Sequence, residues 1–468
     1  EQNVLEHTSS DVSADVLARV QTVREEAATH VGEVMARSSD SAEQMAERFD
    51  RILSEQRGGD FKDMRNLEVL KRLQDHVPEQ AKEAIRMAED RTLERFGARI
   101  EQLPEGERGA QFENYARQMG GDETRHIEIF DRLKQSGVLP QDVAGRIETA
   151  KDIAANRFEK RFEQFEAFEN KDVGAEFRAR ALSRFQAGAA PDIERLRAFE
   201  DLRARVEFTK PEIKAEFEKK HDESIEKFKA TFIDDPSAQQ DAEKFRELSK
   251  RLAENPDPTT FRLLQDLEAK VKADPKKAEF IARMEQEAKS QFVERARTEG
   301  DKFFTQISSS NPQDIEMFKK LQQDFRSRPE TFLAPPGMGP EGFGFGPPGP
   351  GGQVGPPPFA GGVPVGFEFV FDRMINKQAE TLANHVQQID DPALFENFQK
   401  KFQQAAPETA QQILQYQGNF GQLFQARRQF IESQEMDRLE KEREGQLGDD
   451  RRRTGEEFET RLRNAGTQ

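Results

Sequence analysis

The sequence predicts an all-α protein, built as an extended array of degenerate helical-hairpin or three-helix repeats and interrupted by a polyproline-II-like segment rich in Pro and Gly. Helix-start signals recur along the chain, apolar residues follow them at helical spacing, and stretches of about 60–70 residues resemble one another. The alternating pattern that is typical of strands is almost absent. The one candidate strand is residues 363–371 (VPVGFEFVF).

The composition excludes several classes of protein. The 468 residues carry 71 Lys and Arg against 88 Asp and Glu, a net charge of −17, and include no Cys. A chain without thiols forms no disulfide, zinc ribbon, iron–sulfur cluster or cysteine nucleophile. An acidic chain is a poor general binder of nucleic acid and of anionic membranes. Since 35% of the residues are hydrophobic and 34% are charged, thin amphipathic helices are expected rather than thick cores.

The ends of the chain suggest export. It begins at Glu1 rather than Met, without the pattern of a signal peptide, so we interpret it as a processed chain, an expression product or a fragment. Removal of a secretory leader is the ordinary explanation, and the lack of Cys suits it. No run approaches the roughly 18 apolar residues that a membrane span needs. We therefore expect a secreted protein, extracellular or at the cell surface.

Asp or Asn followed by Pro marks many of the expected helix starts. Such a pair combines an N-cap acceptor with a residue whose missing N–H costs nothing in the first turn. The pairs are Asp235-Pro236, Asn255-Pro256, Asp257-Pro258, Asp274-Pro275, Asn311-Pro312 and Asp391-Pro392. Apolar residues follow at helical spacing, which predicts amphipathic helices after these pairs.

Four longer helices align through a Pro and a Phe at a nearly constant separation. The prolines are Pro78, Pro140, Pro211 and Pro275, and the phenylalanines 17 or 18 residues later are Phe96, Phe158, Phe228 and Phe292. Shorter helices are expected before them, starting near Asn66, His126, Asp192 and Thr259, and further copies begin at Asp314 and Ala393. Each unit has an apolar stripe that only a neighbouring unit can bury, which predicts a stacked array.

The domain boundaries follow from these patterns. We expect an N-terminal helical region (1–63), the helical repeats (64–333), a Pro/Gly-rich segment (334–366), a C-terminal helical repeat (367–435) and a charged helix or tail (436–468). Residues 335–366 include 12 Gly and 10 Pro, which favours polyproline II conformation over a packed domain. This segment is either a free linker or an interface with another surface.

Few residues show a pattern typical of a catalytic or metal site. Two Glu-x-x-His motifs, Glu123/His126 and Glu218/His221, have the spacing that places both ligands of a carboxylate-bridged metal site on one helix face. That kind of site needs two more inward-facing Glu residues, so we expect no metal and no cofactor, and metal binding by either motif stays open. The chain has no phosphate-binding loop, EF-hand or Gly-x-Ser-x-Gly motif. We therefore expect no enzymatic activity.

Residues 66–85 (NLEVLKRLQDHVPEQAKEAI) resemble a segment of exported, highly charged α-helical repeat proteins of uncharacterised bacteria, including candidate-phylum lineages. In that segment a Leu-Glu-Val-Leu element precedes a Val-Pro-Glu-x-Ala helix. The resemblance continues in degenerate form over residues 64–333. It implies an exported or cell-envelope setting and provides no catalytic residues to transfer.

These features predict a non-enzymatic structural protein that assembles with copies of itself into a filament, sheath or surface layer. Open repeat arrays have unsatisfied ends that stack without closing. The residues expected to contact a neighbouring copy, by packing or by strand addition, are Phe343, Phe345, Phe359, Phe367, Phe369 and Phe371. Divalent cations bridging acidic pairs are a further option. One alternative is a monomeric binding module of the cell envelope for a protein, a polysaccharide or a divalent metal, and another is a helical-bundle enzyme with a Glu-x-x-His metal site.

Overall fold

The computed structural model is all-α in the part of the chain that it describes, which confirms the all-α prediction. It describes residues 26–35, 40–55, 62–77, 79–119, 123–165, 193–234, 256–328, 330–333, 367–416 and 420–465, with a few isolated residues near residues 23, 37, 180 and 250. No strand occurs among these residues. None of the helices found there has the length and apolar character needed to cross a membrane.

Helices succeed one another along the described chain, and residues 26–35 form a helix before the first labelled one. The labelled elements are α3 (Ala42–Glu55), α4 (Lys62–Gln74), α5 (Glu79–Glu101), α6 (Glu105–Gln118), α7 (Glu123–Ser136), α8 (Gln141–Ala144), α9 (Ile147–Gln164), α11 (Ile193–Arg205), α12 (Pro211–Phe228), the π-helical turn η3 (Lys229–Ile233), α15 (Pro258–Val271), α16 (Pro275–Glu299), α17 (Asp301–Ile307), α18 (Asp314–Ser327), α19 (Glu330–Leu333), α20 (Phe367–Gln388), α21 (Pro392–Gln404), α22 (Pro407–Tyr416) and α23 (Phe420–Ala465).

Three of the Asp-Pro pairs begin helices as predicted. Asp257, Asp274 and Asp391 accept hydrogen bonds from backbone N–H groups in the first turns of α15, α16 and α21, and the adjoining Pro is the first helical residue in each. This satisfies donors that otherwise have no partner within the helix. The Asn311-Pro312 pair differs, because α18 begins two residues later, at Asp314.

The predicted strand over residues 363–371 is wrong in its second half. Residues 363–366 lie outside the described part of the chain, and Phe367 begins α20. A helix forms here because the apolar residues beyond Phe367 continue at helical rather than alternating spacing. Phe371, Ile375 and Leu382 are at most 1% exposed, and they form one buried face of the helix.

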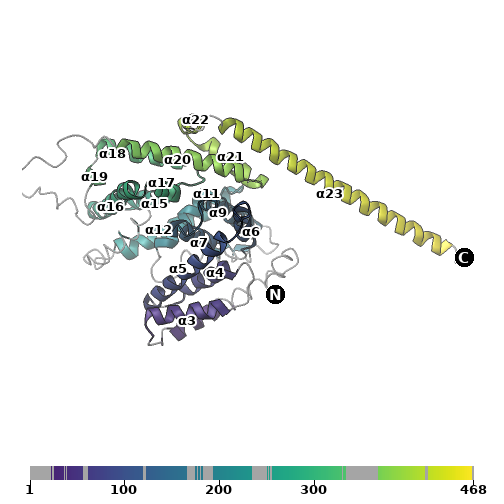
Figure 1. The fold of residues 1–468 in the computed structure, drawn as a ribbon, viewed down its shortest axis with the longest axis horizontal. Helices are drawn as coiled ribbons and strands as arrows, with labels where there is room; N and C mark the ends of the chain where they lie inside the picture. Colours follow the sequence, from purple (N-terminus) through teal and green to yellow (C-terminus); the bar gives the residue numbers. More distant parts are fainter. Residues whose placement is uncertain are drawn as a thin grey trace, which may run out of the picture.

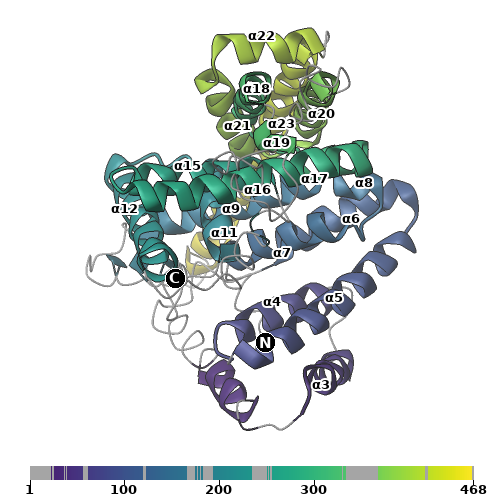
Figure 2. The ribbon, with the colours of Figure 1, turned by 90° about the vertical axis from the view of Figure 1, so that its left-hand side faces the viewer.

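Five short helices contact one another in chain order through the body of the molecule (Figures 1 and 2). Helix α4 contacts α7, α7 contacts α11, α11 contacts α15, and α15 contacts α18. A longer helix packs on each of the first four, namely α5 on α4, α9 on α7, α12 on α11 and α16 on α15. Each of these pairs therefore consists of a shorter and a longer helix in contact.

The stacked helices share one pattern of buried apolar residues, at positions i, i+3 and i+6. This spacing places three side chains on one face of a helix. The triplets are Leu67, Leu70 and Leu73 in α4; Ile127, Phe130 and Leu133 in α7; Ile193, Leu196 and Phe199 in α11; Phe261, Leu264 and Leu267 in α15; and Ile315, Phe318 and Leu321 in α18.

Aromatic rings fill much of the space between the layers. Phe217 of α12 lies edge-on to Phe199, with ring centroids 5.1 Å apart, and Phe292 of α16 stacks on Phe371 of α20 at 5.7 Å. Offset and edge-to-face contacts of this kind add to the free energy of burial. Phenylalanine therefore supplies bulk that a core made from thin helices needs.

Helix α23 projects away from this body (Figure 1). Its first turns contact α20, α21 and α22, with Phe420 and Ile431 buried. Arg427 donates a hydrogen bond to the Ile389 carbonyl at 2.6 Å. Residues 432–441 are all exposed, and the helix continues to Ala465 as a single rod across the predicted boundary between residues 435 and 436.

Candidate functional site

A small pocket is present among the described residues. One pocket lies between α7, α16 and α17, lined by Lys134, Arg295 and Gln306 among others, and its volume is about 20 Å³. That volume holds about one water molecule, whereas ligand pockets usually measure hundreds of cubic ångströms. Exposed helix faces and clusters of ionisable side chains are therefore the better candidates for a functional site.

The predicted interface phenylalanines have different surroundings. Phe343, Phe345 and Phe359 lie outside the described residues, as does the whole Pro/Gly-rich segment. Phe369 is 65% exposed near the start of α20 and remains available to a partner. Phe371 is fully buried among the rings of this chain's own core, so it does not form part of an exposed surface. Phe367 is the first residue of α20.

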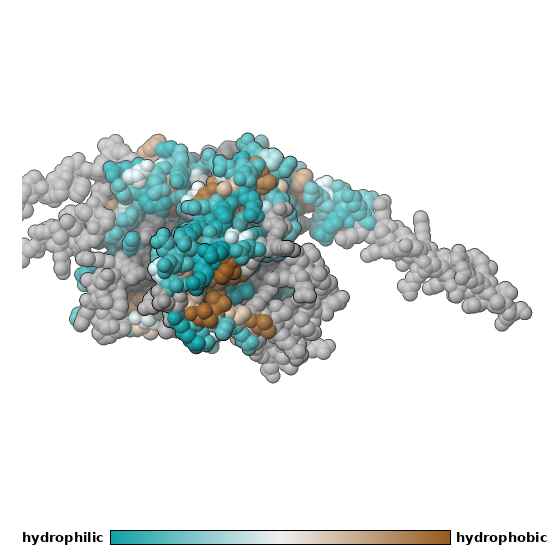
Figure 3. Space-filling model, turned by 60° about the horizontal axis from the view of Figure 1, so that its bottom comes forward, coloured by the Kyte–Doolittle hydropathy of each residue, from teal (hydrophilic) through white to brown (hydrophobic). Residues whose placement is uncertain are grey.

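Exposed apolar side chains recur on α23. Phe430, Met436 and Leu439 are 45%, 66% and 48% exposed. On the face that Figure 3 shows, hydrophilic residues cover most of the described part, with hydrophobic areas between them. Isolated exposed apolar residues are ordinary on protein surfaces, but on α23 they lie on a helix that the body of the molecule does not cover.

The two Glu-x-x-His motifs do not form sites on their own. In the first, His126 Nε2 lies 2.8 Å from Glu68 Oε1 of α4, and Glu123 pairs with Arg161 of α9. In the second, Glu218 is held by an arginine of α11, and His221 turns toward other carboxylates. Each motif residue has thus found a partner on a different helix, which local spacing does not reveal.

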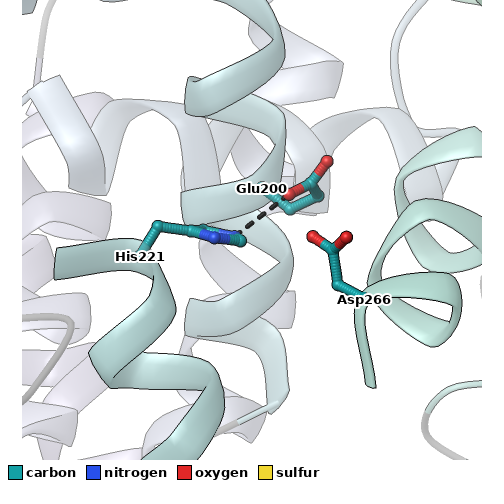
Figure 4. Close-up of side chains that lie close together, drawn as sticks. All are labelled: Glu200, His221 and Asp266. Atoms are coloured by element: carbon teal, nitrogen blue, oxygen red, sulfur yellow. Dashed lines mark ion pairs between the residues drawn. The ribbon is translucent and has the colours of Figure 1, made fainter. Parts of the chain in front are cut away.

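Glu200, His221 and Asp266 converge from three different helices, α11, α12 and α15 (Figure 4). One ligand atom from each side chain lies within 4.8 Å of the other two. His221 Nε2 is 3.0 Å from Glu200 Oε2, and both side chains are 2% exposed. Asp266 lies toward the surface, with 37% of its side chain exposed. The cluster thus reaches from the interior to solvent.

Arg203 joins the carboxylates of this cluster. Its Nη1 donates to Glu200 Oε2 at 3.1 Å and to Asp266 Oδ2 at 2.9 Å, and its Nε donates to Glu218 Oε2 at 2.9 Å. Arg262 donates from Nε to the other oxygen of Glu200, also at 3.1 Å. Two guanidinium groups therefore neutralise part of the negative charge that the three carboxylates bring together.

The electrostatics of the two cluster carboxylates differ. Burial alone raises the pKa of Glu200, but the adjacent His221 and the charge of Arg262 outweigh burial and lower that pKa below its usual value. Burial and the neighbouring Glu200 charge raise the pKa of Asp266, and Arg203 only partly opposes them. Asp266 is therefore the carboxylate that gains most from a further cation nearby.

A second group of buried charges lies between α7, α9 and α11. Lys151 of α9 is 3.1 Å from Asp201 of α11 and also pairs with Asp131 of α7. Arg205 pairs with Glu148, and all of these side chains are largely buried. The sequence did not reveal this group, because charged residues with the same spacing also occur on the exposed faces of surface helices.

No protein family model matches this sequence, and it has no significant similarity to a curated protein or to a solved structure. The function is therefore inferred from the geometry of the chain itself.

Proposed function

We propose that this protein is a non-enzymatic structural protein that assembles with copies of itself outside the cell, as a filament, sheath or surface layer. In this proposal α23 is the element through which copies join. The observation that carries it is the projection of α23 beyond Ile431, with exposed Met436 and Leu439 and no covering helix in the described part of the chain.

A helix of this length is not expected to remain stable without packing. Most helical stability in proteins comes from tertiary contacts, and a glycine in a helix costs about 1 kcal/mol relative to Ala. The part of α23 after Ile431 contains Gly445, Gly448 and Gly455. A partner that packs along α23 supplies the missing contacts.

The charge pattern of α23 favours a second copy as that partner. Acidic and basic residues occur in nearly equal numbers along the helix, in blocks such as residues 440–444 (EKERE) and 449–453 (DDRRR). The chain as a whole has a charge of −17, so surfaces outside α23 repel one another. A helix that carries both signs can pair with itself, because acidic blocks of one copy lie against basic blocks of the other.

The proposal includes a repeat architecture for the body, with units of about 60–70 residues. Equivalent ion pairs between successive helices support it. Glu68, which comes directly after the first buried apolar residue of the α4 triplet, lies 2.8 Å from His126, which precedes the equivalent residue of α7. Arg262 of α15 and Asp314 of α18 occupy the same two positions and form an ion pair. The basic and the acidic side chain have changed places, and the spatial relationship is kept.

We also propose the Pro/Gly-rich segment, residues 334–366, as a second contact between copies. Its support comes from the sequence, in which Phe343, Phe345 and Phe359 are spaced among Pro and Gly. The exposed Phe369, shortly after the segment, extends the same aromatic character onto α20. The absence of Cys is compatible with export, because a chain without thiols forms no unwanted disulfide in an oxidising compartment.

Sedimentation velocity and electron microscopy of two shortened chains test the proposal. A chain that ends at Glu435 keeps the buried Phe420 and Ile431 of α23, so it should stay folded and form no assembly of the size that the full chain reaches. A chain that lacks only residues 466–468 is the matched control and should assemble like the full chain. Assembly of the chain ending at Glu435 to the same size as the full chain would refute the role of α23. Removal of residues 335–366 tests the second contact in the same way.

A monomeric binding module is the second candidate function. The cluster of Glu200, His221 and Asp266 favours it, because imidazole and carboxylates together are a metal ligand set. This candidate predicts that the full chain sediments as a monomer at every concentration.

A further inference from the structure

We infer that Glu200, His221 and Asp266 bind a divalent first-row transition metal ion. Glu218 is placed to become a fourth ligand, and Arg203 holds the carboxylates together when no metal is bound. The inference does not depend on self-assembly, because the cluster lies within one chain, between α11, α12 and α15.

The geometry of His221 and Glu200 suits two ligands of one metal ion. Nε2 and Oε2 are 3.0 Å apart, and the oxygen lies off the line of a well-directed hydrogen bond from the buried Nε2. Two ligand atoms about 3 Å apart and each about 2.1 Å from a metal subtend about 90° at that metal. This is the angle between neighbouring ligands of an octahedral ion, and a modest opening of it gives the tetrahedral angle that Zn²⁺ prefers.

The third ligand and the route to solvent come from Asp266. Its oxygen lies within 4.8 Å of the ligand atoms of Glu200 and His221, and a rotation of this partly exposed side chain brings all three atoms within reach of one ion (Figure 4). Because 37% of the Asp266 side chain is exposed, a hydrated ion can approach from this side. The two deeper ligands are 2% exposed, which shields the site from competing water.

Arg203 occupies the position at which the surrounding carboxylates stabilise a positive charge. Its guanidinium donates hydrogen bonds to three carboxylates, those of Glu200, Glu218 and Asp266, at 2.9–3.1 Å. The side chain is 33% exposed, so it can rotate into solvent when an ion enters. A divalent ion neutralises more of the negative charge of these carboxylates than a single guanidinium does. The displaced Arg203 side chain reaches solvent, where water hydrates its charge.

Glu218 then becomes available on the same helix face as His221. Residues at i and i+3 of a helix lie side by side, and Glu218 is held at present only through Arg203 and remains 39% exposed. This gives the Glu-x-x-His motif of α12 a role that it cannot fulfil alone. The other two ligands come from α11 and α15.

The donor set selects the class of metal. One imidazole with carboxylates suits Zn²⁺, Fe²⁺, Co²⁺ and Mn²⁺, whereas Mg²⁺ and Ca²⁺ prefer oxygen ligands alone. Zn²⁺ is the probe for affinity, and Co²⁺ is the probe for geometry, because its visible absorption reports nitrogen and oxygen coordination.

Isothermal titration of the full chain with Zn²⁺, and absorption spectra with Co²⁺, test the inference. We expect one ion per chain. Asp266→Asn and His221→Gln should each weaken binding by at least about tenfold, since second-shell changes alone already cost that much. Arg203→Gln should strengthen binding, because the competing guanidinium is gone. His126→Gln, in the other Glu-x-x-His motif, is the matched control and should leave affinity unchanged.

Three results would overturn the inference: no stoichiometric ion in the full chain, unchanged Zn²⁺ affinity in Asp266→Asn, or weaker binding in Arg203→Gln. Asp266→Asn decides the question if His221→Gln fails to fold, because Asp266 is partly exposed and its loss leaves no cavity in the core. Circular dichroism of each variant checks the fold independently. Zn²⁺ should also raise the Tm of the full chain by mass action, and this rise should be lost in Asp266→Asn.

Discussion

Arg205 of α11 donates a hydrogen bond from Nη2 to Glu148 Oε2 of α9 at 2.7 Å, and both side chains are at most 4% exposed. The same guanidinium donates to Asp152 at 2.7 Å and to Asp201 at 2.9 Å. A buried arginine thus links three carboxylates between two neighbouring helices. Charged side chains, as well as apolar ones, fix how these helices stack.

Glu148→Gln should lower the free energy of unfolding by about 3–5 kcal/mol, because it leaves buried cations without their partner. Glu148 pairs with Lys134 at 2.5 Å in addition to Arg205. Urea unfolding followed by circular dichroism measures the change. Glu279→Gln is the control, since its ion pair with Arg283 is exposed, and it should have little effect. Equal effects of the two variants would contradict the structural role of the buried pair.

The stabilisation from Glu148 should depend on pH. Burial alone raises its pKa, but Lys134 and Arg205 outweigh burial and hold that pKa well below the usual value. A lowered folded-state pKa means that the stabilisation is complete above the unfolded pKa of about 4.3 and is lost as the pH falls toward the folded-state pKa. The difference in unfolding free energy between the full chain and Glu148→Gln should therefore be constant from about pH 7 to 5 and shrink below about pH 4. A difference that grows in acid would contradict this assignment.

Two phenylalanines of α20 should respond differently to truncation. Phe371 is fully buried, so Phe371→Ala should cost about 3–5 kcal/mol of stability through loss of packing. Phe369 is 65% exposed, so Phe369→Ala should change stability by less than about 0.5 kcal/mol. Thermal or urea unfolding of both variants measures the contrast. A large loss of stability in Phe369→Ala would show that this residue packs on its own chain.

Adjacent aspartates before α21 should also differ. Asp391 Oδ1 accepts hydrogen bonds from the Ala393 and Leu394 amides at 2.8 and 3.3 Å, so Asp391→Ala should cost about 1 kcal/mol. Asp390 makes an exposed ion pair with Arg117, so Asp390→Ala should have a much smaller effect. The comparison needs only the unfolding midpoints of the two variants. Equal midpoints would mean that the cap does not stabilise α21.

The helices of this fold could be predicted from the sequence because the signals for them are local. The caps at Asp257, Asp274 and Asp391 and the spacing of apolar residues after them depend only on neighbouring positions. The strand prediction for residues 363–371 failed because apolar residues that alternate over a few positions can also occur in the first turns of a helix. The longer spacing of Phe371 and Ile375 decides between the two.

The candidate site could be predicted only in part. Local spacing identifies Glu218 and His221 as neighbours on one helix face. The partners Glu200 and Asp266 lie on other helices, and tertiary packing alone brings them within reach of His221. The same holds for Arg205 and Glu148, whose pairing depends on how α9 and α11 stack. Charges in the interior of this protein therefore look like surface charges until the helices are placed.

The central claim, that copies join along α23, is tested most directly by a distance between two chains. The chain has no Cys, so Ser433→Cys on the exposed part of α23 carries a single spin label without further changes. We predict a defined dipolar distance between labels on neighbouring chains, which disappears when Met436 and Leu439 are both replaced by Glu. The same replacement at exposed Ile52 of α3 should leave the distance intact. Labels that show no interaction between chains, at concentrations where the full chain forms assemblies, would contradict the account.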